Sequence, residues 1–374
     1  MKPRQKISGL AQLGKLLVIG FDGTTVSGEL RSLLTRIQPA GVILFARNIQ
    51  NARQTHGLLK DCGALVKEPL FKCVDLEGGR VDRFRDVTGP TPAPADVYAT
   101  SDRELFRKHG EIVGKTCRAL GFNVDLAPVL DLACEASRTV MGSRSVAPSP
   151  RDVIIYAREF VRGLRASGVL GAGKHFPGLG EGKLDSHHRL PVIRKPFARL
   201  WEEDLLPYRR MKRELPMILV SHANYPLVTG DRLPATFSKK WIGETLRRRI
   251  GYRGLILSDD LEMGAVVKTG GPAKAAVEFI RAGGDLGFIC QGQENVEQAF
   301  AAMEREYERD AKFRQQVAAA ASRVSALKRR ARIGRSAGAP STGTIEKLSR
   351  RLWEFAEQVR FEKLAEGAGS GVEE

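Results

Sequence analysis

Eight short apolar runs, separated by segments with helical spacing, limit the fold of this chain more than any other feature of its sequence. Polar or glycine residues follow each run, as they do where a buried strand ends. The runs are Leu16–Phe21, Gly41–Phe45, Leu70–Val74, Asn123–Leu126, Gly168–Lys174, Met217–Val220, Gly254–Leu257 and Leu286–Cys290. Strands that alternate with helices form a parallel sheet, and eight such units over about 290 residues are the size of a (β/α)8 barrel. We therefore predict an α/β chain with a single TIM-type barrel.

The helical segments between these runs support the same fold. The clearest one follows Ser149-Pro150, where one apolar face is formed by Val153, Ile154, Ala157, Phe160, Val161 and Leu164. A doubly wound open sheet is the alternative architecture. The loop after the first run, GFDGTT, lacks the GxGxxG fingerprint of that fold, which favours the barrel.

The composition changes after Arg335, and this change predicts the domain organisation. Residues 1–335 are expected to form the barrel domain, and the following SAGAPSTGT is typical of a flexible linker. Helical spacing returns at Ile345, Leu348, Leu352, Phe355 and Val359. Residues 336–374 are therefore expected to comprise a linker, a terminal helix and a disordered tail.

Charge and cysteine content limit the partners and the compartment. The formal charge of +17 is concentrated in clusters such as LRRRIGYR (246–253), without interleaved aromatic residues, so solvated helix faces are favoured over a nucleic-acid site. No run approaches the ~20 apolar residues of a membrane span. The five cysteines lack any CxxC spacing, which indicates a reducing cytoplasm and no structural zinc.

Polar side chains follow almost every predicted strand, at the barrel end where active sites lie. They are Asp75, Asp131, Arg144, Lys174, His175, His222, Asp259 and Asp260. Each one alone is as well explained by a helix cap or a surface charge. Their joint placement at one end of the barrel favours a functional site.

The stretch KHFPGLGEGKLDSHHRLP (174–191) gathers three histidines, an aspartate and alternate glycines on one loop. No HExxH or His-x-His pair supports a metal site, and no GxSxG turn supports a serine hydrolase. Glycoside hydrolysis needs a carboxylate and a proton donor on opposite sides of the anomeric carbon, and these loops contain both kinds of group.

Several longer segments carry a family resemblance. They are GVILFARN (41–48), VDLEGGRVDRFR (74–85), NVDLAPVLD (123–131), GSRS (142–145), the 174–191 stretch, SHANYP (221–226), PATFS (234–238) and GLILSDDLEMGAV (254–266). In this order and content the chain resembles the β-N-acetylglucosaminidase branch of glycoside hydrolase family 3, over roughly residues 10–330.

The resemblance implies a retaining, exo-acting mechanism with a covalent glycosyl-enzyme on Asp259. Asp260, the next residue, is then expected to be a helix-capping or supporting group. It also implies that His187, paired with Asp185, is the acid/base. An imidazole with a pKa of about 6.5 suits proton transfer near neutral pH. Gly178, Gly180 and Gly182 are expected to let this loop close and reopen. The residues implied to bind the terminal sugar are Asp75, Arg144, Lys174, His175 and His222.

The implied substrate is a small carbohydrate, expected to be a cell-wall muropeptide fragment, and its carboxylates suit a basic chain. We expect no cofactor, no metal, no nucleic-acid or membrane partner, a monomer, and a cytoplasmic role in peptidoglycan recycling. A β-N-acetylglucosaminide phosphorylase or transglycosylase using the same site is the alternative. Leu179 departs from the histidine usual in this branch, and we expect it to alter loop packing or leaving-group preference.

Overall fold

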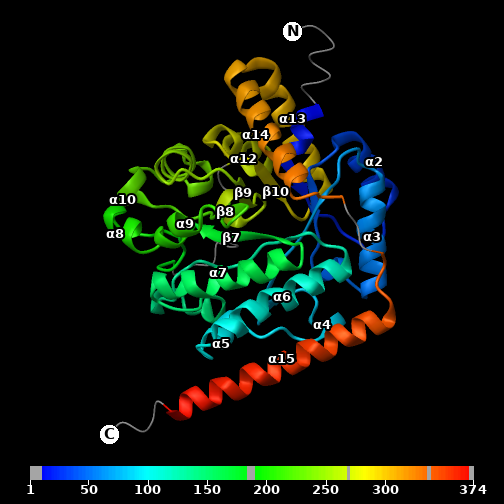
Figure 1. The fold of residues 1–374 in the computed structure, drawn as a ribbon. Helices are drawn as coiled ribbons and strands as arrows, with labels where there is room; N and C mark the ends of the chain where they lie inside the picture. Colours follow the sequence, from blue (N-terminus) through cyan, green and yellow to red (C-terminus); the bar gives the residue numbers. More distant parts are fainter. Residues whose placement is uncertain (1–10, 183–189, 268–269, 335–337, 370–374) are drawn as a thin grey trace.

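A computed structural model describes residues 11–182, 190–267, 270–334 and 338–369. Its centre is a closed barrel of parallel strands in the order β1-β10-β9-β8-β7-β6-β3-β2 (Figure 1). The strands are β1 (Leu17–Ile19), β2 (Gly41–Ile43), β3 (Phe71–Val74), β6 (Val124–Asp125), β7 (Leu170–Phe176), β8 (Met217–Val220), β9 (Leu255–Asp260) and β10 (Leu286–Ile289). Each overlaps one predicted run, and β1 pairs with both β2 and β10. The predicted barrel is confirmed, and the open-sheet alternative is wrong.

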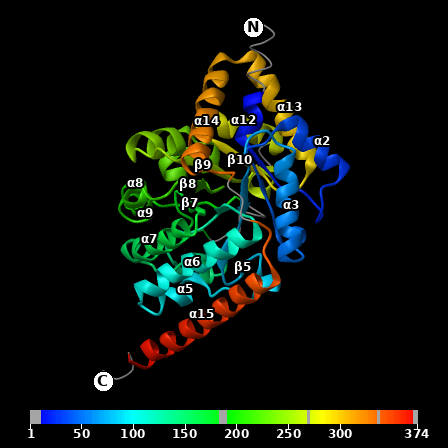
Figure 2. The same cartoon turned by 45° about the vertical axis from the view of Figure 1, so that its right-hand side comes forward.

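Helices connect the strands and form the outer layer (Figures 1 and 2). They are α2 (Gly28–Ile37), α3 (Ala52–Ala64), α6 (Arg103–Leu120), α7 (Pro150–Ala166), α8 (Phe197–Glu202), α9 (Leu206–Met211), a π-helix (Lys240–Arg249), α11 (Gly264–Val267), α12 (Gly271–Ala282), α13 (Gln293–Arg309) and α14 (Ala311–Arg330). In the described part of the chain, no helix is long and apolar enough to cross a membrane.

Helix α7 shows how the sequence determines these elements. Ser149 is its N-cap and accepts a hydrogen bond from the Asp152 N–H, while Pro150 occupies the first turn, where its missing N–H costs nothing. The six apolar residues predicted to form one face are all buried, because that face packs against the barrel and α6.

The barrel strands divide their side chains between two cores. Alternate residues point to opposite faces of a strand, so one set fills the barrel and the other meets the helices. The inner set includes one residue from every strand: Val18, Ile43, Cys73, Val124, Ala172, Leu219, Leu257 and Phe288. Neighbours such as Ile19, Val74 and Ile218 belong to the larger core between barrel and helices.

The connection from β3 to α6 is elaborated at the barrel's C-terminal end. It contains a two-stranded hairpin, β4 (Leu76–Gly78) with β5 (Val81–Asp82), and two short helices, α4 (Arg85–Thr88) and α5 (Pro94–Tyr98). Asp82 stabilises this excursion, because its carboxylate accepts hydrogen bonds from the backbone N–H groups of Phe84 and Thr91, both 2.8 Å. The hairpin is not among the runs that the sequence predicted as strands.

A long terminal helix, α15 (Thr342–Gly369), lies along α6 and also contacts α4 and α5 (Figures 1 and 2). Leu352, Phe355 and Val359 are buried in this contact, as the helical spacing predicted. Trp353 and Phe361 lie on the outer side and remain about two-thirds exposed, at 65% and 61%. The predicted C-terminal helical extension is therefore present.

Candidate active site

A cavity of about 790 Å³ opens at the C-terminal ends of the barrel strands. It is lined by six of the polar residues predicted to lie at this end: Asp75, Arg144, Lys174, His175, Asp259 and Asp260. Lys174 and His175 lie near the end of β7, Asp259 lies near the end of β9, and Asp75 follows β3 directly. Arg144 comes from the short helical turn Gly142–Arg144. The closed barrel thus brings together side chains that are far apart in the sequence.

Glu77, on the β4 strand, joins these side chains into one network. Its carboxylate accepts two hydrogen bonds from the Arg144 guanidinium, both 2.7 Å, and lies 2.6 Å from the Lys174 ammonium. Lys174 also contacts Asp75 at 2.7 Å. Glu77 is buried, so its position depends on these cations rather than on water. Asp75, Glu77, Arg144 and Lys174 thus form a charged wall of the cavity, in which anions and cations alternate and polar atoms are available to a ligand.

Charge pairing in this wall keeps Glu77 and Lys174 ionised. Burial on its own raises the pKa of Glu77, but Arg144 and Lys174 outweigh burial and hold that pKa well below its ordinary value. Burial lowers the pKa of Lys174, yet Asp75 and Glu77 outweigh it and leave the pKa raised. Charged donors and acceptors form short, strong hydrogen bonds, and these suit the hydroxyls of a sugar.

Asp131 positions both His175 and the start of the next loop. One carboxylate oxygen lies 2.6 Å from His175 Nδ1 and also accepts a hydrogen bond from the His175 N–H at 3.1 Å. The other oxygen accepts a hydrogen bond from the Leu179 N–H at 2.6 Å. Because a carboxylate only accepts, Nδ1 carries the proton and Nε2 faces Arg144 at 3.3 Å. Asp131 thus fixes which nitrogen of His175 faces the cavity.

Asp259 has the charge state that a nucleophile needs. Its carboxylate accepts a hydrogen bond from the Asp260 N–H at 2.9 Å. Burial on its own raises the pKa of Asp259, but His222 and His175 outweigh burial and hold it below the ordinary value. At neutral pH the group is therefore an ionised carboxylate at the edge of the cavity, able to attack an electrophilic carbon.

Asp260 and His222 are neighbours of this carboxylate, and Asp260 also lines the cavity. Asp260 accepts a hydrogen bond from the Glu262 N–H at 3.0 Å, and burial raises its pKa to about 7. His222 Nε2 lies 2.8 Å from the Asp260 carbonyl oxygen, and Nδ1 lies 2.7 Å from the Thr236 hydroxyl. His222 does not line the cavity. Its predicted contact with the sugar stays a prediction, and the geometry places it as a support for β9.

The predicted acid/base pair, Asp185 and His187, falls in residues 183–189 and lies outside the described residues. The described part of the same loop is held firmly. Tyr225 donates a hydrogen bond to the Gly178 carbonyl oxygen at 2.6 Å. Gly178 has a φ of 132°, and a Cβ there would lie 2.7 Å from Asp204 Cβ. Only glycine suits this position.

Sequence reasoning gave no role to two residues that organise the site, Glu77 and Asp131, although Asp131 was among the polar side chains predicted to lie at this end of the barrel. Both were visible as polar residues after predicted strands, yet nothing in their spacing showed that they bind Arg144, Lys174 and His175. It also missed three arginines, Arg47, Arg80 and Arg83, that line the cavity. No group of three or more His, Cys, Asp or Glu side chains in the described residues is arranged to hold a metal ion.

Comparisons with known proteins agree on one family. Residues 4–327 match the model described as glycosyl hydrolase family 3 N terminal domain. A protein of Alkalilimnicola ehrlichii named beta-hexosaminidase is 41% identical over 287 residues, 75% of this chain and 82% of the relative. A Pseudomonas aeruginosa protein of the same name is 34% identical over 292 residues, 77% of this chain and 86% of the relative.

A solved structure is similar over most of the chain. It is a glycoside hydrolase family 3 beta-N-acetylglucosaminidase from Paenibacillus sp. str. FPU-7, with a TM-score of 0.84 and 31% identity. The similarity covers 92% of this chain and 68% of that one.

Proposed function

The chain belongs to glycosyl hydrolase family 3 and is a glycosidase of the beta-hexosaminidase type, and from this premise we propose that it is a retaining exo-β-N-acetylglucosaminidase. It removes a terminal N-acetylglucosamine from a β-linked glycoside. Asp259 attacks the anomeric carbon and forms a covalent glycosyl-enzyme, which water then hydrolyses with retention of configuration.

One observation carries this proposal: the ionised Asp259 faces the same cavity as the charged wall built on Glu77. In the proposed complex the sugar hydroxyls bind to Asp75, Lys174 and Arg144, and these contacts hold the anomeric carbon against the Asp259 carboxylate. Positioning of this kind turns a bimolecular attack into a unimolecular one. A low pKa keeps Asp259 charged without a separate base.

Proton transfer to the leaving oxygen is assigned to His187, oriented by Asp185, on the loop that follows β7. The support for this step is the sequence resemblance together with the position of the loop. Its first residues, up to Gly182, follow β7 directly at the cavity, and Leu179 lines the cavity wall. An imidazole can donate a proton to the departing alcohol and afterwards accept one from water.

The proposed natural substrate is a muropeptide fragment, hydrolysed during cell-wall recycling in the cytoplasm. The support is the set of arginines in the cavity. Arg80 and Arg83 have no ion-pair partner among the described residues, and Arg83 lies over the Phe45 ring at 5.6 Å. Free cations beside an apolar ring suit a leaving group that carries carboxylates.

Initial rates on 4-nitrophenyl N-acetyl-β-glucosaminide and on the plain β-glucoside test the activity. We expect the N-acetyl sugar to be strongly preferred, Asp259→Asn to lose nearly all turnover, and His187→Ala to turn over slowly. Mass spectrometry of His187→Ala during turnover should show the protein plus one N-acetylglucosaminyl residue on Asp259. Normal turnover in Asp259→Asn would exclude it as the nucleophile.

Added phosphate separates the proposal from its alternative. A histidine acid/base does not repel phosphate as a carboxylate would, so a phosphorylase with this site is chemically reasonable. Hydrolysis should be independent of phosphate, and free N-acetylglucosamine should be the product. Phosphate-stimulated turnover with a sugar phosphate as product would identify a phosphorylase instead.

A further inference from the structure

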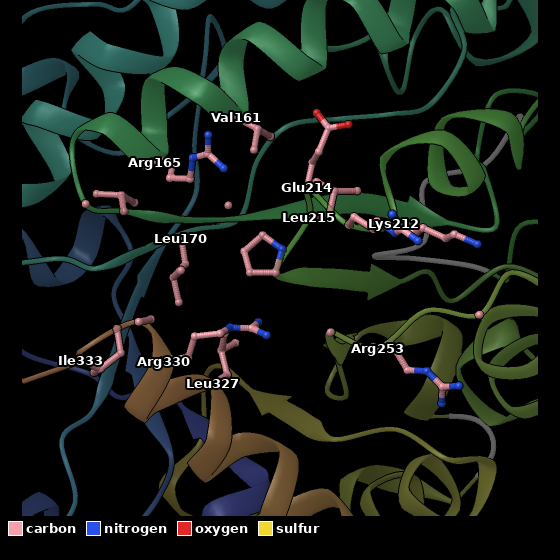
Figure 3. Close-up of a pocket in the computed structure, with 18 residues that line it drawn as sticks. Val161, Arg165, Leu170, Lys212, Glu214, Leu215, Arg253, Leu327, Arg330 and Ile333 are labelled. Atoms are coloured by element: carbon pink, nitrogen blue, oxygen red, sulfur yellow. The ribbon is translucent and has the colours of Figure 1, made fainter.

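A second cavity, of about 770 Å³, opens at the opposite end of the barrel from the candidate active site (Figure 3). It lies where the chain enters the neighbouring strands β7, β8 and β9. Gly168 to Gly171 lead into β7, Pro216 precedes β8, and Gly254 precedes β9. The end of α14 closes one side with Leu327, Arg330 and Ile333. The size is within the range of small-molecule sites, about 300–1,000 Å³.

The floor of this cavity is apolar. It is formed by Leu170, Leu215, Pro216 and Leu327, and Figure 3 shows Leu170 between α7 and α14. Leu215 and Leu327 are buried, at 2% and 5% exposed, so they belong to the packed core under the cavity. An apolar floor of this size favours a ligand with a hydrocarbon or aromatic body.

The rim of the cavity is cationic. Its charged members are Arg165, Lys212, Arg213, Glu214, Arg253 and Arg330. Glu214, the acidic member, is already bound by Arg158, whose Nε lies 3.1 and 2.9 Å from its two carboxylate oxygens. Figure 3 shows the Glu214 carboxylate turned toward α7. Among the described residues, none forms an ion pair with the four rim arginines.

Helix electrostatics explain only part of this rim. Arg165 and Arg330 lie in the last turns of α7 and α14, where cations are favourable. Arg213 directly follows Lys212, the C-cap of α9, where a cation is also favourable, whereas Arg253 lies in the loop between the end of the π-helix and β9. Like charges around one apolar floor repel each other, and an anion bound between them would relieve that repulsion.

We propose that this cavity is a binding site for a small anionic amphiphile. The apolar body lies on Leu170, Leu215 and Leu327, and the phosphate or carboxylate head lies between Arg165 and Arg330, which Figure 3 shows on opposite sides of the cavity. This site is independent of the proposed glycosidase activity, because it uses none of the residues in the catalytic cavity.

Isothermal titration calorimetry with octyl phosphate, below its micelle-forming concentration, tests the site on the full-length protein. We expect one octyl phosphate to bind per chain and affinity to rise roughly threefold to fourfold for each added methylene of the alkyl chain. Inorganic phosphate, 1-octanol and octyltrimethylammonium each lack one required feature and should bind far more weakly. Equal binding of inorganic phosphate and octyl phosphate would overturn the proposal.

A pair of neighbouring charge reversals locates the site. Arg330→Glu should weaken octyl phosphate binding by at least about tenfold. It removes a cationic hydrogen-bond donor to the phosphate and puts in its place a carboxylate, which has the same charge sign as the phosphate. Arg329→Glu changes the net charge equally, on an exposed residue that does not line the cavity, and should leave affinity within about twofold. Equal losses in both variants, or binding only to phosphatidylglycerol vesicles, would contradict a small-molecule site in this cavity.

Discussion

Glu77 and Arg144 form a two-pronged ion pair, with both nitrogen–oxygen distances 2.7 Å, in the wall of the catalytic cavity. Glu77 is 1% exposed and Arg144 lies beside it at the surface of the cavity. Glu77 therefore helps to hold the side chains of both Arg144 and Lys174 in position. Removal of its negative charge should therefore affect both stability and substrate binding.

Glu77→Gln should lower the free energy of unfolding by about 3–5 kcal/mol, since it leaves Arg144 without its anion and leaves Lys174 paired with Asp75 alone. The Michaelis constant should also rise, because Lys174 and Arg144 lose their fixed positions. Urea unfolding and steady-state kinetics measure the two effects. Glu135→Gln is the control, because the Glu135 side chain is 85% exposed and pairs with Arg138 at the surface. Similar stability losses in both variants would contradict the central role of Glu77.

Asp131→Asn should lower kcat/KM by about 10–100-fold without unfolding the protein. The amide can present a donor to His175 Nδ1, which favours the opposite tautomer and turns a protonated Nε2 toward Arg144. The NMR signal of the Nδ1 proton should disappear in the variant. Asp96→Asn, at a surface ion pair with Lys363, serves as the control and should change neither observable. An unchanged Nδ1 signal in Asp131→Asn would rule out this positioning role.

Asp260→Asn should raise the melting temperature at about pH 8 and change it much less at about pH 5. Burial raises the pKa of Asp260 from 3.8 to about 7. The folded state therefore binds this proton more tightly than the unfolded state, and the resulting stability is present in acid and lost as pH rises through 7. Asparagine resembles the neutral acid and avoids that loss. Differential scanning calorimetry measures the effect, and a pH-independent difference would contradict it.

Phe355→Ala should destabilise the protein by about 3–5 kcal/mol. Phe355 is fully buried between α15 and α6, where its ring stacks on His109 at 5.7 Å. Phe361→Ala changes the same residue type on the same helix, but its ring is 61% exposed, so its effect should stay within about 0.5 kcal/mol. Chemical unfolding of the two variants tests whether α15 is part of the cooperative fold. Equal effects would show that it is not.

The barrel was predictable because each strand is a short buried run between helical segments. The hairpin of β4 and β5 was not, since strands of three and two residues are too short to show a period. Its Gly78 and Gly79 were visible only as part of a family motif. The hairpin was not predicted because its strands are short, not because they lack apolar residues.

Part of the membership of the candidate site was predictable from the sequence, but the pairing of its charged side chains was not. Asp75, Lys174 and Asp259 follow predicted strands, so barrel topology alone brings them to one end. Which carboxylate meets which cation depends on side-chain directions that the spacing does not contain. His222 is an example: it follows β8 as predicted, yet its two ring nitrogens face the Thr236 hydroxyl and the Asp260 carbonyl oxygen, and it is not among the residues that line the cavity.

The packing of α15 on α4, α5 and α6 links the last helix of the chain to one of the first layers to be synthesised. Because α15 follows every barrel element in the sequence, the ribosome delivers it after all the side chains that it covers. A barrel that folds before α15 docks therefore exposes the surface that Phe355 covers, and the docking of α15 ends that exposure.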